Sequence, residues 1–108
     1  MRRIVLVGGR GTRLDVEVAQ TRSERMRGLL RRERLPPGGA LLIEGTSSVH
    51  TFGMRFPIEV AFLDGRLRVV ALRRMPPGRL TLPRRGVAAV LECPAGTGLR
   101  VGDLLRPA

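Results

Sequence analysis

The chain has 108 residues, 43% of them hydrophobic, so it can bury one core but is too short for two domains of useful size. Its 20 basic residues are all arginine and give a net charge of +11. This charge reflects either the codon usage of a GC-rich gene or an anionic partner such as nucleic acid, lipid head groups or an acidic protein. A single cysteine excludes an internal disulfide, and one histidine with one cysteine excludes a Cys/His zinc site.

Residues 3–20 are predicted to form a β-hairpin. A short run typical of a β-strand occupies residues 3–7, and a Gly-Gly-Arg-Gly turn follows it. From residue 14 onward, apolar side chains alternate with Asp15, Glu17 and Ala19. A period of two marks a strand with one buried face, so the two runs are expected to pair.

One short helix is predicted near residues 22–32. Thr21 and Glu24 match a capping box, in which the two side chains accept hydrogen bonds from backbone N–H groups of the first turn. Met26, Leu29 and Leu30 then recur at helical spacing. A Pro-Pro-Gly-Gly run follows at residues 36–39 and is expected to interrupt regular secondary structure there.

The remainder of the chain is predicted to be short strands joined by turns. Asp64-Gly65 is its strongest hairpin signal. The expected strands cover residues 40–43, 58–63, 66–73, 80–82, 87–93 and 104–105, with an irregular extended stretch at 49–54. We therefore expect a mainly β fold, either a small β-sandwich or a partly open, jelly-roll-like barrel, in a single domain over residues 1–108.

Glu59 and Glu92 are candidate site residues because each interrupts an otherwise apolar strand. A buried carboxylate needs a partner or a shifted pKa. Two explanations stay open. The carboxylates form structural ion pairs with Arg25 or Arg55, or they belong to a site that binds a hydroxylated ligand or performs acid–base chemistry. In both cases we expect the two carboxylates to point towards one polar pocket.

His50 and Thr51 begin the stretch that holds the only histidine and all three phenylalanines. A lone histidine without a Ser or Cys nucleophile motif does not support a catalytic triad, so we expect His50 to bind a ligand rather than catalyse. The phenylalanines are expected in the core, and Cys93 is expected to be an inert small hydrophobe. The predicted ligand-binding residues are therefore His50, Thr51, Arg55, Glu59, Glu92 and Arg25.

Three groups of motifs occur in a recognisable order. They are Ala19, Thr21, Glu24-Arg25 and Gly28-Leu29-Leu30; His50 to Ile58 with Phe62-Leu63-Asp64; and Val90-Leu91-Glu92, Ala95-Gly96-Thr97 and Gly102-Asp103. Over residues 14–105 this order and spacing resemble the domain-of-unknown-function 192 family. The resemblance implies a small β-sandwich of jelly-roll-like type with a short helix, and a suspected carbohydrate-binding role.

The function that these observations favour is a non-catalytic module that binds a small polar ligand, such as a sugar or a small anion, without a cofactor or metal. The alternatives are a basic nucleic-acid-binding protein, and a hydrolase that uses Glu59 and Glu92 as a carboxylate pair. We expect the arginines to scatter over the surface, so that binding to nucleic acid is weak and non-specific. The longest apolar runs are far too short to be a signal sequence or to span a membrane, so we expect a cytoplasmic protein with no membrane partner.

Overall fold

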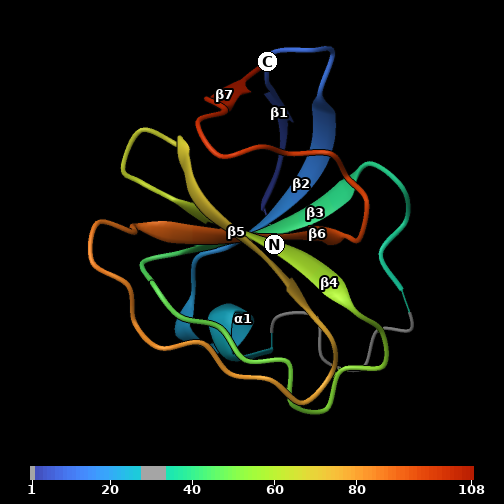
Figure 1. Cartoon of the computed structure of the whole chain (residues 1–108), viewed down its shortest axis with the longest axis vertical. Helices are drawn as coiled ribbons and strands as arrows, with labels where there is room; N and C mark the ends of the chain where they lie inside the picture. Colours follow the sequence, from blue (N-terminus) through green and yellow to red (C-terminus); the bar gives the residue numbers. More distant parts are fainter. Residues whose placement is uncertain (1, 28–33) are drawn as a thin grey trace.

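The structure is a computed structural model that describes residues 2–27 and 34–108, and it shows a sheet curled into a half-barrel (Figure 1). The elements are β1 (Arg2–Val7), β2 (Arg13–Ala19), α1 (Arg22–Arg27), β3 (Gly39–Glu44), β4 (Ile58–Leu63), β5 (Val69–Met75), β6 (Ala89–Pro94) and β7 (Arg106–Pro107). The predicted mainly β fold with one short helix is thus confirmed, in its partly open barrel form.

The seven strands lie in the order β5-β4-β6-β3-β2-β1-β7. All neighbours are antiparallel except β2 and β3, which run parallel. A parallel pair cannot be joined by a tight turn, so the chain makes a crossover between these two strands. The crossover contains α1 and the Pro-Pro-Gly-Gly run.

The C-terminal segment connects the two ends of the curled sheet. Beside the start of β5, the Val69 N–H donates to the Asp103 carbonyl at 2.8 Å, and the Leu105 N–H donates to the Leu67 carbonyl at 3.0 Å. The chain then continues as β7, which pairs with β1 near the top of Figure 1. Leu105 is fully buried under this closure.

Both faces of the sheet carry buried apolar clusters. The first cluster includes Leu6, Leu14, Val16, Val18, Leu42, Ala61, Leu91 and Cys93. The second includes Leu41, Ile43, Val60, Phe62, Met75 and Val90. Loop residues Leu35, Val49 and Met54 cover this second cluster. Because both of their faces are buried, the central strands are apolar along nearly their whole length.

The expected return strand at residues 66–73 begins later, at Val69. The Asp64 carboxylate accepts hydrogen bonds from the backbone N–H groups of Arg66 and Arg68 at 2.9 and 3.0 Å. Leu67 adopts a positive φ of 67°. The side chain of Asp64 therefore stabilises a longer turn than the two-residue hairpin that Asp64-Gly65 predicted.

Two other strand predictions are wrong in detail. Residues 80–82 form only an isolated bridge, between Leu80 and His50, and Leu104 likewise forms a bridge with Arg68. The last strand is β7, at residues 106–107.

The prediction that all three phenylalanines lie in the core is also wrong for Phe52, which is 51% exposed, whereas Phe62 is 3% exposed. Within the described residues, no helix is long and apolar enough to cross a membrane.

The predicted capping box is present at the start of α1. The Thr21 hydroxyl accepts from the Glu24 N–H at 3.1 Å, and Glu24 Oε1 accepts from the N–H groups of Thr21 and Gln20 at 3.0 and 3.1 Å. These backbone bonds, that from Thr21 first, lower the pKa of Glu24 from 4.5 to about 2. Residues 28–32 of the predicted helix lie outside the described residues.

The capping box makes stability depend on pH in a predictable direction. The folded-state pKa of Glu24 is depressed, so its stabilising effect is complete above pH 4.5 and is lost as the pH falls towards 2. We expect the difference in unfolding free energy between the wild type and Glu24→Gln, measured with urea, to be largest near neutral pH and to shrink over that interval. A Glu24 carboxyl that titrates near 4.5 by NMR would contradict this expectation.

Candidate functional site

The register of the sheet separates Glu59 from Glu92. Glu59 lies opposite Cys93 of β6, whereas Glu92 lies opposite Val60 of β4. Residues that face each other across neighbouring strands share a face, and successive residues alternate between faces. The two carboxylates therefore lie on opposite faces of the sheet, and the expectation that they point into one pocket is wrong. Glu92 is 2% exposed on the face of Leu41, and Glu59 is half-buried on the other.

Thr51 has a structural role in its surroundings. Its side chain is fully buried, and its hydroxyl donates to the Pro76 carbonyl at 2.7 Å while accepting from the Arg79 N–H at 2.9 Å. These bonds attach the loop after β3 to the loop after β5. The hydrogen and one lone pair of the hydroxyl are therefore used within the fold, and the sequence-based assignment of Thr51 to a ligand stays a prediction.

The remaining predicted site residues are Arg25, in α1, and His50 and Arg55, in the loop between β3 and β4. His50 is exposed, and its ring stacks on Phe52 with 5.5 Å between centroids. Arg25 donates from Nη1 to the Glu44 carbonyl at 3.3 Å, at the end of β3, and Arg55 is exposed.

Cys93 is buried, and this burial, together with the charges of Glu59 and Glu92, raises the pKa of its thiol to about 12. A thiol with so high a pKa remains protonated near neutral pH, which agrees with the inert role expected for Cys93.

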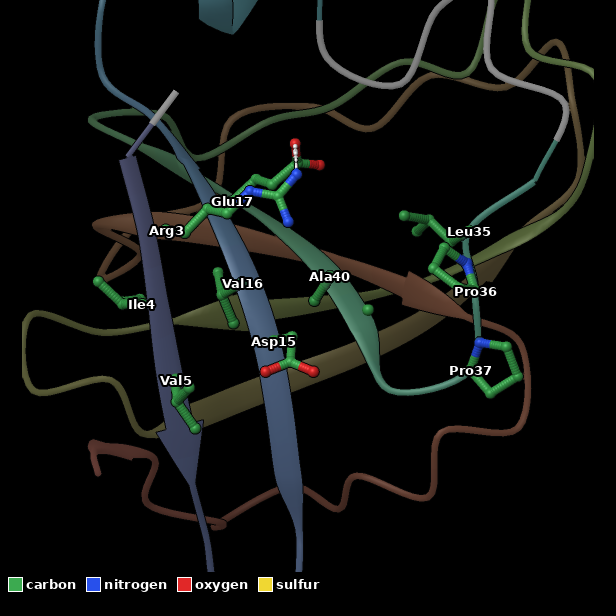
Figure 2. Close-up of a pocket in the computed structure, with 11 residues that line it drawn as sticks. Arg3, Ile4, Val5, Asp15, Val16, Glu17, Leu35, Pro36, Pro37 and Ala40 are labelled. Carbon is green, nitrogen blue, oxygen red and sulfur yellow. Dashed lines mark ion pairs between the residues drawn. The ribbon is translucent and has the colours of Figure 1, made fainter.

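A cleft beside the β1–β2 hairpin brings together charged residues that the sequence did not single out (Figure 2). Its volume is about 600 Å³, within the usual range of small-molecule sites. The residues that line it are Arg3, Ile4, Val5, Asp15, Val16, Glu17, Leu35, Pro36, Pro37, Gly39 and Ala40.

The floor of the cleft follows from the alternation of β2. Burial of Leu14, Val16 and Val18 on one face turns Asp15 and Glu17 to the other. In register, Glu17 lies opposite Arg3 of β1. On the other side, Asp15 lies beside Gly39 of β3, which has no side chain to fill the space.

The wall of the cleft is formed by the Pro-Pro-Gly-Gly run. The Gly39 N–H donates to the Pro36 carbonyl at 2.9 Å, and Gly38 has a φ of 77°, as a type II turn requires. A Cβ at Gly39 would approach the Pro36 oxygen to 3.1 Å, so a side chain there would push the turn away from β3 by a few tenths of an ångström. Leu35, Pro36 and Pro37 are thereby held facing the carboxylates, as Figure 2 shows.

The charges of the cleft differ from those of the whole chain. Arg3 and Glu17 form an ion pair at 3.5 Å, in which the arginine side chain is 79% exposed and the glutamate 21%. Asp15 is exposed and forms no ion pair with a described residue, so its carboxylate is open to the cleft. The cleft thus offers two carboxylates and one guanidinium on a chain of net charge +11. The carboxylates accept hydrogen bonds from hydroxyl or amine groups, and the guanidinium donates them.

The sequence did contain a signal for this site. The alternation of residues 14–19 already placed Asp15 and Glu17 on one strand face, in a chain with only nine acidic residues. What the sequence could not reveal was the neighbour of that face. The pairing of β2 with Arg3 and Gly39, and the return of Leu35–Pro37, depend on contacts between distant parts of the chain.

Comparisons with known proteins identify relatives of the chain. The DUF192 family model, described as "Uncharacterized ACR", matches residues 3–106. A UPF0127 protein of Thermococcus sibiricus (strain DSM 12597 / MM 739) is 32% identical over 85 residues, which are 75% of this chain and 55% of that protein. The chain thus spans about half the length of this curated relative.

Two crystal structures are similar to the fold. A putative transcription regulator from Sinorhizobium meliloti 1021 has 27% identity and a TM-score of 0.81, covering 97% of this chain and 92% of that one. A protein of unknown function from Novosphingobium aromaticivorans DSM 12444 has 23% identity and a TM-score of 0.81, with coverages of 96% and 83%, and it shows similarity of fold alone.

Thr51 provides a direct test of structural against ligand-binding roles. Thr51→Val keeps the shape of the side chain but leaves the Pro76 carbonyl and the Arg79 N–H without their buried partner. We expect it to lower the free energy of unfolding by about 2 kcal/mol, measured by urea denaturation. As a control, Thr12→Val should change stability by less than about 0.5 kcal/mol, since the Thr12 hydroxyl bonds to no other described residue. Unchanged stability of Thr51→Val would contradict the structural role.

Proposed function

Since the chain belongs to the DUF192 family, whose description names no activity, we propose its function from the geometry of the cleft: the protein binds a small hydroxylated molecule such as a sugar, without converting it. The observation that carries the proposal is the arrangement of Asp15, Glu17 and Arg3 on the floor of the 600 Å³ cleft, opposite the wall of Leu35–Pro37.

The polar groups of the cleft favour a hydroxylated ligand over a small anion. Ionised carboxylates only accept hydrogen bonds, so Asp15 and Glu17 suit ligands that donate them, and they repel phosphate or sulfate. Arg3 adds donors next to Glu17 for the oxygens of the same ligand.

The wall supplies the apolar side of such a site. The rings of Pro36 and Pro37 and the side chain of Leu35 offer C–H surface for the less polar face of a sugar ring, in place of the aromatic platform that a chain without Trp or Tyr lacks. The turn at Pro36–Gly39 fixes this surface before the ligand arrives, which reduces the entropy cost of binding.

The lining residues support binding more than catalysis. They include no His, Cys, Ser or Lys, the usual nucleophiles and proton carriers besides carboxylates. A role in holding nucleic acid also fits this cleft poorly, because its carboxylates would face the phosphates of the backbone.

A thermal-shift screen with isothermal titration tests the proposal. Hexoses, pentoses and inositol are compared with phosphate and sulfate. At ten times its Kd, a ligand should stabilise the wild type by about 1.4 kcal/mol, or roughly 6–11 °C in Tm for a chain of this size. We expect a hydroxylated compound to produce such a shift, and Asp15→Asn with Glu17→Gln to weaken its binding by about 10–100-fold.

The matched control is Glu59→Gln, which removes a half-buried carboxylate from the opposite face of the sheet. It should leave binding unchanged. If Glu59→Gln abolished the shift while the Asp15/Glu17 variant retained it, the ligand would occupy the site first predicted from the sequence. A response to phosphate alone would contradict the choice of a hydroxylated ligand.

A further inference from the structure

A two-stranded ribbon lies away from the cleft and exposes apolar side chains. The ribbon consists of residues 49–51 and 79–82, which run side by side where the green and orange segments pass in Figure 1. The Thr51 N–H donates to the Arg79 carbonyl at 2.8 Å, and the Thr81 N–H donates to the Val49 carbonyl at 2.9 Å. The Thr81 hydroxyl also accepts from the Val49 N–H at 2.9 Å, so the ribbon is firmly held.

The two faces of the ribbon are opposite in character. On the inner face, Val49, Thr51 and Thr81 are at most 8% exposed. On the outer face, Leu80 is 59% exposed and Leu82 is 79% exposed. His50 lies opposite Leu80 and carries the stacked ring of Phe52 beside it. Leucines so exposed on a rigid backbone are typical of an interaction surface.

The ribbon also has an unused backbone edge. Thr81 and Arg79 direct their N–H and C=O groups towards residues 49–51, so the peptide groups of Leu80 and Leu82 point the other way. Neither Leu80 nor Leu82 forms a backbone hydrogen bond with another described residue. An open edge of this kind is a template for a further strand.

The charge around the ribbon indicates the chemistry of the added strand. Residues 45–58 and 65–91 contain no Asp or Glu, whereas arginine occurs at 55, 66, 68, 73, 74, 79, 84 and 85. Arg79, Arg84 and Arg85 flank the two leucines and are exposed. This surface attracts an acidic partner and repels a second copy of the same chain, which would bring the same charge.

We propose that the ribbon binds an extended, acidic polypeptide segment of a partner protein, which adds as a third strand along residues 80–82. Its backbone pairs with Leu80 and Leu82, its apolar side chains cover the exposed leucines, and its carboxylates meet the flanking arginines. Nucleic acid fits this surface less well, because phosphates make no use of the two leucines or of the strand edge.

The first test is a selection of random heptapeptides displayed on phage against the full chain. We expect enrichment of sequences that alternate Asp or Glu with Val, Ile or Leu. A synthetic peptide of the most enriched sequence should bind less tightly as salt rises, because the flanking arginines contribute to binding. Binding should protect the amide of Leu80 or Leu82 from hydrogen exchange, which a purely electrostatic contact would not do. Absence of an acidic consensus, or binding without this protection, would overturn the proposal.

Variants separate the contributions of side chain and backbone. Leu80→Ser with Leu82→Ser should weaken peptide binding at least tenfold, and Leu82→Pro, which removes an edge N–H, should do the same with the leucine at position 80 intact. Val101→Ser removes another exposed apolar residue, 63% exposed and far along the chain from the ribbon, and should have no effect. An oligothymidylate that bound more tightly than the peptide, and did so equally to wild type and leucine variants, would identify a nucleic-acid surface and overturn the proposal.

Discussion

The position of β2, between the antiparallel β1 and the parallel β3, is the constraint on which the cleft depends. A parallel neighbour forces the chain to leave the sheet and return over one of its faces before β3 begins. The hydrophobic face of β2 is committed to the core, so its acidic face meets the returning segment. The cleft with its carboxylates is therefore a consequence of one strand pairing, and the turn at Pro36–Gly39 sets how closely the returning chain approaches β3.

The net charge of +11 is distributed unevenly along the chain. Near the N-terminus, two arginines have carboxylate partners: Arg3 pairs with Glu17, and Arg10 pairs with Asp103. The two stretches around the ribbon contain no carboxylate of their own, and Arg79, Arg84 and Arg85 flank the exposed leucines there. A bias in codon usage would account for arginine in place of lysine, but not for the absence of carboxylates from residues 45–58 and 65–91.

Features that depend on a few neighbouring residues could be predicted from the sequence. The boundaries of β4, the start of α1 at its capping box and the break at residues 36–39 all follow from local patterns. Features that depend on which strands are neighbours could not. The alternation of side chains along each strand placed Glu59 and Glu92 on apolar strand faces. Only the register of β4 against β6 shows that these two faces lie on opposite sides of the sheet. The same limit applies to Phe52, which is exposed and stacks on His50, and to the cleft, whose floor and wall come from three separate segments.

One apolar cluster supports both proposed surfaces. It contains Leu35, the base of the cleft wall, together with Val49 from the inner face of the ribbon. Shared packing alone does not couple two sites, because coupling requires an element with two arrangements that both ligands favour differently. The polarity of the surfaces instead keeps their ligands apart: the carboxylates of Asp15 and Glu17 repel an acidic peptide, and the arginine-flanked leucines offer few acceptors to a neutral sugar. The fold thus offers two surfaces of opposite charge, one on the sheet and one on the ribbon, and in both proposals charge selects the ligand before shape is matched.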